Sequence, residues 1–459
     1  MGLRAIVIGL DGAAPELLFG RWLDELPVLR ALTERGRYGI LRSCDPPITV
    51  PAWACMTSSR DPGAHGVYGF RNRGERSYAP LRFATSRSLR FPRVWDVLSA
   101  RGRPVLVLGA PPAYPVTPVR GGMVSCFLAP ELATHPKELA AELEAIVGRY
   151  LLDAPSFRSS DEDRLLADLD EVAAKRFRAA EHLLATRPWD LFFLVEIGSD
   201  RIQHRFWRYT DPTHILYEPG HRYGSAILDY YRRLDARIGR LLRFAEEGTA
   251  VLVVSDHGVK GNDGGVHVNE WLRREGYLVL RNEPNGPAPL VPELVDWART
   301  TAWGEGGYYG RVFLNVAGRE PSGTVSPSEY ERVRDDIRRE LEALGDEQGR
   351  PLGNVVHRPE DLYAKRNGIA PDLIAYFGDL RWRSFGEVGV GGVHRRESDG
   401  NDANHAHEGL YVFVADGVES GPGPVLDIHD VAPTLLALLG ERAPRWMEGR
   451  SAVEPNGRW

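Results

Sequence analysis

Short runs of apolar residues alternate along this chain with longer segments that have helical spacing. Residues 5–10 form a continuous apolar run that ends in Asp11 and Gly12, a pattern typical of a central parallel strand. Further strand-like runs lie at 38–41, 105–108, 189–195, 251–254 and 410–414. Apolar residues at helical spacing occupy 27–35, 94–101, 136–150, 161–186, 226–247 and 428–439. This alternation predicts an α/β fold with a doubly wound, mainly parallel central sheet flanked by helices.

The pattern changes between residues 282 and 402. Strand-like runs at 311–316, 355–356 and 372–376 surround one charged helix, expected at 327–344 with Ser326 as its N-cap. The stretch 386–402 is rich in glycine and arginine and is expected to be a loop. We therefore expect a catalytic core made of 1–281 and 403–459, interrupted by a smaller α+β subdomain and loop at 282–402.

Composition and charge limit the kinds of binding partner expected for this chain. The 459 residues are 43% hydrophobic, the net charge is −6, and no basic run is interleaved with aromatic residues, which argues against a nucleic-acid polymer as partner. The three cysteines lack the spacing of a metal site or a disulfide framework, and the first apolar run is too short for a signal peptide or a membrane span. These features favour a cytoplasmic protein that acts on a small molecule without a membrane partner.

Carboxylates and imidazoles gather where the predicted strands end. These residues are Asp11, Asp200, His204, Asp256, His257, His405 and His407. In open α/β sheets ligands bind beyond the carboxyl ends of the strands, so segments distant in sequence converge there. Asp200 and His204 are four residues apart and would share one helical face.

Mixed aspartate and histidine ligands suit zinc, and also manganese or iron, better than calcium or magnesium. Two such ions about 3.5–4 Å apart would hold the entering and leaving oxygens of a phosphoryl transfer. Any one of these pairs, considered alone, is as well explained as a helix cap or a core histidine. Together they predict two divalent metal ions, with zinc preferred.

Thr49 stands between Pro47 and Pro51, just before a segment with helical character from Ala52. A hydroxyl at a helix N-terminus is placed where backbone N–H groups and the helix dipole favour a phosphate. By itself the stretch is also an ordinary proline-rich loop entering a helix. The metal-type ligands elsewhere in the chain favour the phosphate interpretation.

Several short motifs occur in an order that resembles one known family. They read IGLDG (8–12), TVPAW (49–53), PGAHG (62–66), SDRIQH (199–204), SDHG (255–258), HVNEWL (267–272), LNVAGREP (314–321), APDL (370–373), DVAPTL (430–435) and MEGR (447–450). Their order and spread over the chain resemble the alkaline phosphatase superfamily, in its type I phosphodiesterase/nucleotide pyrophosphatase branch with the related phosphohydrolases and phosphomutases.

The resemblance implies roles for individual residues. Thr49 would be the nucleophile. One metal ion would be held by Asp11, Thr49, Asp256 and His257, and the other by Asp200, His204 and a late histidine. The late ligand of the family precedes a glycine by four residues, which selects His405 before Gly409, with His407 and His394 as competitors.

The sequence also departs from the family. Nucleotide pyrophosphatases carry an asparagine five residues after the histidine of the His-Gly motif, where this chain has Phe70. Asn72 or Arg71 is the candidate replacement. Arg395, Arg396 and His407 are further candidates for binding an anionic part of the substrate, because arginine's fork suits carboxylate or phosphate.

The resemblance and the residues together predict a metal-dependent phosphoester hydrolase. Thr49 would attack phosphorus and form a phosphothreonine, which water then hydrolyses. Phosphodiesters or nucleotide-type pyrophosphates are preferred over monoesters as substrates. The alternatives are a phosphomutase, a phosphonate or phosphomonoester hydrolase of the same superfamily, and a non-catalytic binding protein on this fold.

Overall fold

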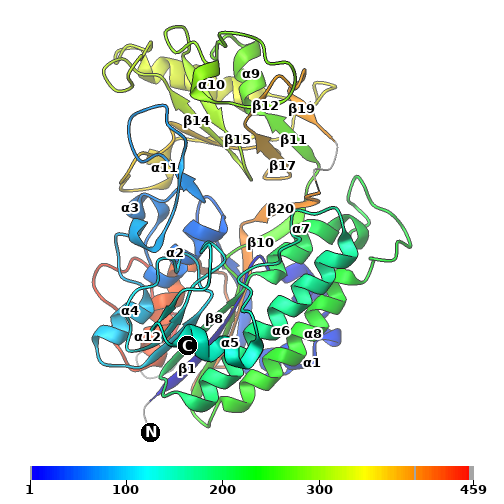
Figure 1. Cartoon of the computed structure of the whole chain (residues 1–459), viewed down its shortest axis with the longest axis vertical. Coiled ribbons are helices and arrows are strands. Elements are labelled where there is room, and N and C mark those ends of the chain that lie inside the picture. Colours follow the sequence, from blue (N-terminus) through cyan, green and yellow to red (C-terminus); the bar gives the residue numbers. More distant parts are fainter. Residues whose placement is uncertain (1–2, 397–399, 454–459) are drawn as a thin grey trace. The chain divides into compact units, whose positions relative to one another are not determined.

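A computed structural model describes residues 3–396 and 400–453 (Figure 1). The chain divides into two compact units, which are described separately. Unit 1 comprises Met1–Phe70, Ala84–Val259 and His405–Trp459, and unit 2 comprises Arg71–Phe83 and Lys260–Asn404. In the part of the chain that the structure describes, no helix combines the length and the apolar character needed to cross a membrane.

Unit 1 is built on a large sheet, which has ten strands among the described residues. At its centre β1 (Arg4–Leu10) runs parallel to β8 (Leu191–Glu196) on one side and to β9 (Thr249–Val254) on the other. The strand order is β22-β2-β21-β9-β1-β8-β5-β6-β7, and β23 pairs with β2. The remaining strands are β2 (Arg37–Arg42), β5 (Val105–Leu108), β6 (Gly121–Val124), β7 (Thr134–His135), β21 (Glu408–Val414), β22 (Gly421–Pro422) and β23 (Leu426–Asp427). The predicted doubly wound, mainly parallel sheet is confirmed.

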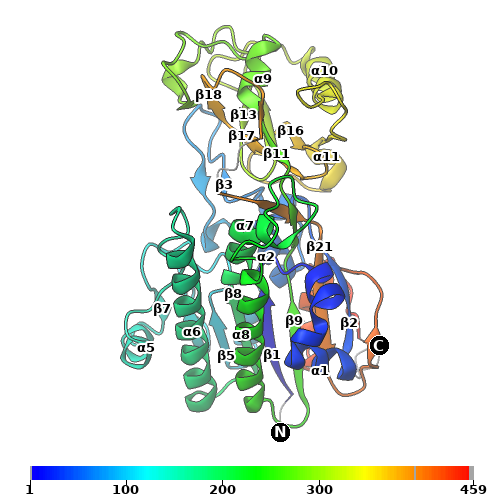
Figure 2. The same cartoon turned by 90° about the vertical axis from the view of Figure 1, so that its right-hand side faces the viewer.

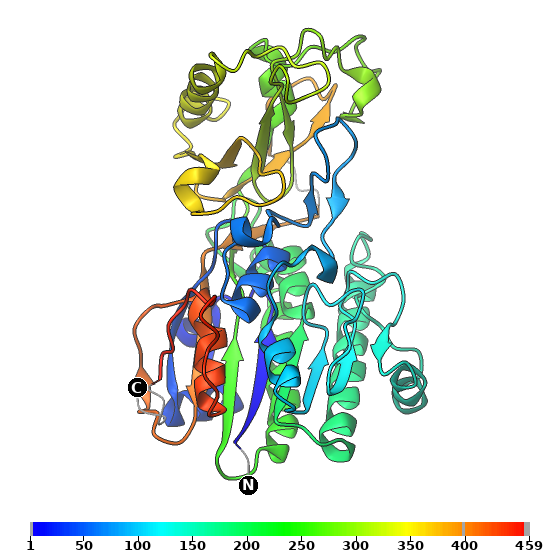
Figure 3. The ribbon, with the colours of Figure 1, turned by 90° about the vertical axis from the view of Figure 1, so that its left-hand side faces the viewer.

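Helices cover both faces of this sheet. Figure 2 shows α1 (Pro27–Arg35), α6 (Glu162–Thr186) and α8 (Ala226–Leu241) over one face. Figure 3 shows α12 (Val431–Leu438) and α4 (Val94–Ala100) over the other. The other helices of unit 1 are α2 (Thr49–Ser58), α3 (Pro62–His65), α5 (Leu139–Val147), α7 (Gly198–Thr210), the π-helix Glu16–Arg21 and the 3-10 turns Leu23–Glu25, Ser86–Ser88, Leu242–Phe244 and Ile428–Asp430.

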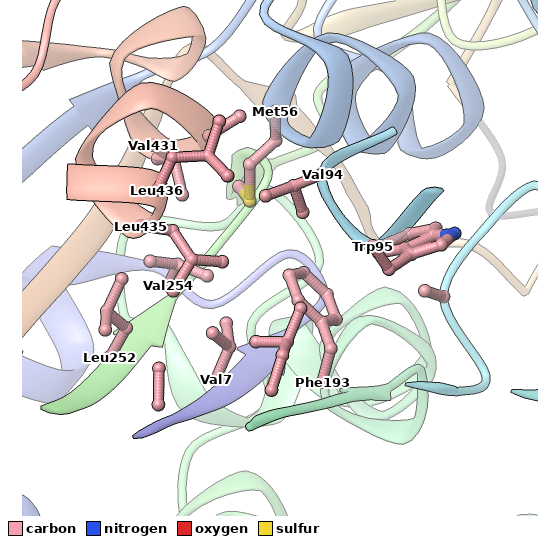
Figure 4. Packing of buried hydrophobic residues seen from close by; sticks show 14 of the residues in the cluster. Val7, Met56, Val94, Trp95, Phe193, Leu252, Val254, Val431, Leu435 and Leu436 are labelled. Atoms are coloured by element: carbon pink, nitrogen blue, oxygen red, sulfur yellow. The ribbon is translucent and has the colours of Figure 1, made fainter. Parts of the chain in front are cut away.

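One hydrophobic cluster fills the space between the sheet and this second set of helices (Figure 4). Val7, Phe193 and Leu252 come from the three central strands, and Met56 and Leu435 come from α2 and α12. Successive side chains of a strand point to opposite faces, so alternate residues of each strand enter this cluster. The cluster anchors α2, the helix that begins at Thr49.

Unit 2 has its own hydrophobic cluster and several small sheets. In its four-stranded sheet, of order β13-β14-β16-β15, all the neighbours pair antiparallel. The strands within unit 2 are β3 (Arg71–Asn72), β4 (Arg82–Phe83), β11 (Gly264–His267), β12 (Ala288–Pro289), β13 (Ala302–Glu305), β14 (Gly310–Leu314), β15 (Val355–His357), β16 (Leu373–Tyr376), β17 (Trp382–Phe385), β18 (Glu387–Val388) and β19 (His394–Arg395). Its helices are α9 (Val268–Arg274), α10 (Tyr330–Ala343), α11 (Pro359–Leu362) and the 3-10 turn Pro292–Leu294.

Local details differ from the sequence-based expectations. Unit 2 begins at Lys260 rather than at residue 282, because β11 pairs with β17 and β19, and it also includes Arg71–Phe83. Helix α10 begins at Tyr330 after Glu329, so Ser326 is not its N-cap; the Ser326 hydroxyl donates to the Glu329 carboxylate instead. The stretch expected as a loop at 386–402 contains β18 and β19, and its residues 397–399 lie outside the described part.

Leu252→Ala should lower the free energy of unfolding by about 2–5 kcal/mol, because Leu252 is fully buried in the cluster that supports α2 and truncation leaves a cavity. Chemical denaturation monitored by circular dichroism measures the change. The matched control is Val425→Ala, since Val425 is 65% exposed and should change the same quantity by no more than about 0.5 kcal/mol. Equal effects of the two substitutions would contradict this account of the core.

Candidate metal centre

The candidate ligands lie beyond the carboxyl ends of the three central strands. Asp11 follows β1, Asp256 lies two residues after β9, and Asp200 lies in the first turn of α7, which follows β8. The register pairs Leu10 with Glu196 and Gly9 with Val254, so these strands end side by side. All three carboxylates are fully buried. The expected convergence of these segments is therefore present within unit 1.

Thr49 is the first residue of α2, so the helix begins three residues earlier than expected. Pro51 is tolerated there because N–H groups in the first turn of a helix have no intrahelical acceptor. The Thr49 hydroxyl donates to Asp11 Oδ1 across 3.4 Å and lies 3.3 Å from His257 Nε2. The hydroxyl is thus held at a helix N-terminus beside a carboxylate and an imidazole.

Two groups of three residues among those described have ligand atoms within 4.8 Å of one another. In the first group, His257 Nε2 lies 3.5 Å from Asp11 Oδ1 and 3.4 Å from Asp256 Oδ2. The second group contains Asp200, His257 and His405, and the rings of His257 and His405 stack with centroids 3.7 Å apart.

His204 extends the second group. Its Nε2 lies 3.0 Å from Asp200 Oδ1 and 3.2 Å from His405 Nε2, as expected for residues that share one face of α7. His405 lies on β20 (Ala403–Ala406), and its Nε2 is 3.6 Å from Asp200 Oδ1. The structure thus brings together the seven residues to which the family resemblance assigns the metal ions, namely Asp11, Thr49, Asp200, His204, Asp256, His257 and His405.

The donor chemistry of this cluster fits divalent metal ions. The buried Asp200 Oδ1 is paired with the His204 imidazole. The buried Asp256 Oδ2 accepts no hydrogen bond from the described residues, which is costly unless a cation compensates it. Nδ1 of His257 lies 2.9 Å from the Gly258 carbonyl, and Nδ1 of His405 lies 2.7 Å from the Pro47 carbonyl. A hydrogen bond to a carbonyl places the proton on Nδ1, so the Nε2 lone pairs face the carboxylates and can bind metal.

The protonation equilibria reflect the crowding of charge. Burial and the charge of Asp200 raise the pKa of Asp11 well above its usual value, and burial and the charge of Asp11 do the same to the pKa of Asp256. Burial also opposes ionisation of Asp200, but His204 and Arg201 outweigh it and hold the pKa of that carboxyl well below its usual range. Burial lowers the pKa of His257 to about 4 and that of His405 well below its usual value, so both imidazoles are neutral near pH 7. Neutral imidazole is the form that binds metal ions.

Comparison with protein-family models matches residues 5–403 to the family described as type I phosphodiesterase / nucleotide pyrophosphatase. The chain belongs to this family. The resemblance predicted from the sequence motifs is confirmed, and the chain is a phosphoester hydrolase by membership.

Two solved structures that match share the fold of this phosphodiesterase-family chain. One is phosphonoacetate hydrolase from Sinorhizobium meliloti 1021 in complex with phosphonoformate, which is 18% identical over 92% of this chain and 91% of that one, with a TM-score of 0.56. The other is murine ectonucleotide pyrophosphatase / phosphodiesterase 5, which is 13% identical over 96% of each chain, also with a TM-score of 0.56. Comparison with curated protein sequences finds no match.

Two residues that sequence reasoning missed hold the carboxylates of this phosphodiesterase-family site in place. Trp53, one turn after Thr49, donates from Nε1 to Asp11 Oδ2 across 2.7 Å. A Cβ on Gly9 would lie 2.3 Å from the Trp53 ring, so the glycine of β1 leaves room for the indole. Arg201 donates to Asp200 Oδ2 across 3.1 Å and also pairs with Asp153. Both residues lie inside motifs that the sequence analysis singled out, Trp53 in TVPAW and Arg201 in SDRIQH.

The competing histidines lie elsewhere. His407 Nε2 is 2.8 Å from Asp45 Oδ1 and belongs to neither group of ligand atoms. His394 lies on β19 of unit 2, with Nε2 2.8 Å from the Gly345 carbonyl. The geometry thus favours His405 as the late ligand.

The predicted substrate-binding residues are dispersed. Phe70 packs with the small cluster that contains Val50, the residue after Thr49. Asn72, Arg395 and Arg396 belong to unit 2. Arg396 pairs with Glu347 at 3.0 Å and lies over the Trp382 ring, and Arg395 lies over the Phe385 ring.

Trp53→Phe should weaken zinc binding by about 10–100-fold, because it removes the outer hydrogen bond that orients Asp11. Competition with a fluorescent zinc chelator measures the affinity without any turnover assay. Trp95→Phe is the matched control, since Trp95 is buried in the same hydrophobic cluster but its Nε1 has no hydrogen-bond partner. Equal zinc affinities of the two variants would show that the indole hydrogen bond has no such role.

Proposed function

We propose that this chain hydrolyses a phosphoester through a covalent phospho-Thr49 intermediate at a two-metal site. The observation that carries the proposal is the position of the Thr49 hydroxyl, within 3.4 Å of Asp11 Oδ1 and 3.3 Å of His257 Nε2, at the first residue of a helix. A buried hydroxyl in this position has ligands for cations beside it and a helix N-terminus that favours a phosphate.

We assign Asp11, Thr49, Asp256 and His257 to one divalent ion and Asp200, His204 and His405 to the other, with zinc preferred. When bound, such ions lower the pKa of a coordinated hydroxyl and stabilise charge on the phosphoryl oxygens. Asp256 is positioned for this role by the Gly12 N–H, which donates to its Oδ1 across 3.2 Å. Asp11 is oriented by Trp53 in the same way.

In the first step, Thr49 Oγ1 forms a bond to phosphorus while the bond from phosphorus to the leaving oxygen breaks. The hydroxyl hydrogen bond to Asp11 Oδ1 gives the proton a route away from Thr49 Oγ1, and the departing oxygen takes up one proton. In the second step water attacks phosphorus, the bond to Thr49 Oγ1 breaks, and the hydroxyl is restored. The net reaction adds one water molecule across the ester bond.

Among substrates we favour phosphodiesters and nucleotide-type pyrophosphates, in line with the family description. Phosphonate hydrolysis is the second candidate, because the phosphonoacetate hydrolase shares the fold. Phe70 beside Val50 supplies an apolar surface where nucleotide pyrophosphatases carry an asparagine. Rates on bis(4-nitrophenyl) phosphate, 4-nitrophenyl phosphate, ATP and phosphonoacetate distinguish the candidates, and exclusive turnover of phosphonoacetate would overturn the ester assignment.

Thr49→Ala should lower turnover of bis(4-nitrophenyl) phosphate by at least about 10²–10³-fold, because the variant lacks both the nucleophile and one metal ligand. Its fold and at least one bound metal ion should remain. Steady-state kinetics together with metal analysis test this expectation. The control is Thr57→Ala in the same helix, because the Thr57 hydroxyl donates to the Trp53 carbonyl. A rate for Thr49→Ala close to that of the control would show that water attacks the ester directly.

Purified holoenzyme should contain close to two zinc ions per chain by mass spectrometry, and a chelator should abolish turnover. Removal of the metal should also lower the melting temperature, because the buried carboxylates then lose their compensating charge. At a free zinc concentration of 100 times Kd, binding at one site raises the free energy of unfolding by about 2.7 kcal/mol. Asp256→Asn should retain roughly one ion, since only one group of ligands is changed. Full activity after exhaustive metal removal would refute a metal mechanism.

A further inference from the structure

Unit 2 contains a cavity of about 480 Å³ that the proposed chemistry does not use. Its lining comes from residues of that unit only, namely 71, 73, 77–81, 289–292, 297, 303–307 and 383–387. Pockets for small molecules commonly have volumes of about 300–1,000 Å³ and combine apolar walls with a few polar groups. The cavity has both kinds of lining.

Three aromatic rings form a rigid apolar wall. The ring of Tyr78 stacks on that of Trp297 with centroids 3.6 Å apart and an interplanar angle of 6°, and the edge of Trp303 meets both. The Tyr78 hydroxyl donates to Asn315 Oδ1 across 2.7 Å and accepts from the Ser322 N–H across 2.9 Å. These two hydrogen bonds fix the Tyr78 ring, so the wall is preformed for a flat or apolar group.

Polar groups with spare bonding capacity lie in the same lining. The Ser384 hydroxyl is buried and has no hydrogen-bond partner in the described part of the chain. The exposed Arg71 guanidinium lies over the Phe83 ring at 4.5 Å, and its charge acts against burial on the pKa of Glu305. Arg73 is paired with Glu320 at 3.2 Å. A buried hydroxyl without a partner is costly, and a ligand that accepts its hydrogen bond would remove that cost.

The backbone around Ser384 is fixed. Gly307 N–H donates to the Ser384 carbonyl across 2.7 Å, and Ser384 N–H donates to the Gly307 carbonyl across 3.0 Å. A Cβ on Gly306 would lie 2.5 Å from Gly386 N, so glycine is required for the two segments to pass this closely. Burial also raises the pKa of Glu305, which reduces the negative charge opposed to an anion here.

We propose that this cavity binds a small planar molecule that carries a carboxylate or phosphate. The ring of the ligand would contact the Tyr78, Trp297 and Trp303 wall, and its anionic group would accept hydrogen bonds from Arg71 and the Ser384 hydroxyl. The ligand can be a non-reacting part of the substrate or a separate effector, since both share this chemistry. The binding claim stands apart from the proposed hydrolysis, because neither Thr49 nor a metal ligand lines the cavity.

Isothermal titration calorimetry with the holoenzyme measures the binding of 2-naphthoate, which joins a planar ring to a carboxylate. 2-Naphthol and acetate test the ring and the charge separately. We expect 2-naphthoate to bind at least about tenfold tighter than either, and Arg71→Gln and Ser384→Ala each to weaken it by about tenfold, the size expected for a lost hydrogen bond to a charged group. Ala79→Trp, at an exposed position of the lining, should block binding.

The matched control is Arg299→Gln, which removes an exposed arginine of unit 2 outside the lining and should leave binding unchanged. Equal affinities for 2-naphthoate and 2-naphthol, or undiminished binding in both Arg71→Gln and Ala79→Trp, would overturn the proposal. The effect of 2-naphthoate on the turnover of bis(4-nitrophenyl) phosphate then distinguishes a part of the substrate from a separate effector as the ligand of the cavity. Competitive inhibition by 2-naphthoate identifies a substrate subsite, and a change in kcat alone identifies an effector site.

Discussion

The structure of unit 1 depends on the burial of three carboxylates at one edge of a parallel sheet. Asp11, Asp200 and Asp256 are fully shielded from water, and among the described residues Asp256 Oδ2 accepts no hydrogen bond. Such charges are expensive in a protein interior unless cations compensate them. Arg201 compensates Asp200 only in part, because it also pairs with Asp153. The two proposed metal ions would complete this compensation.

Helix α2 links this charge constraint to the hydrophobic core. Its residues Trp53, Cys55 and Met56 belong to the large cluster of unit 1, while its first residue places a hydroxyl beside Asp11 and His257. Trp53 takes part in both, since its ring packs in the core and its N–H orients Asp11. Packing of the helix therefore determines the position of the Thr49 hydroxyl, because a buried helix cannot shift without opening cavities.

Unit 2 has a separate hydrophobic cluster and a pocket with its own rigid walls. The ligand groups of the metal centre all belong to unit 1. The candidate metal ligands and the lining of the unit 2 pocket are thus built from different parts of the chain. A substitution in that lining leaves the candidate metal ligands in place.

The sequence by itself predicted the central strands and the residues of the candidate metal centre. Local sequence pattern is enough to predict the buried strands at 5–10 and 251–254 and the shared helical face of Asp200 and His204. The order of the motifs can likewise be read directly from the sequence. Tertiary structure alone decided between His405 and His407, because both are near the same strand and only the fold turns one toward Asp200 and the other toward Asp45. It also decided the role of Trp53 and the extent of unit 2, to which Arg71–Phe83 and Lys260–Asn404 contribute. These features arise from contacts between residues that lie far apart in the sequence, which periodicity and propensity do not encode.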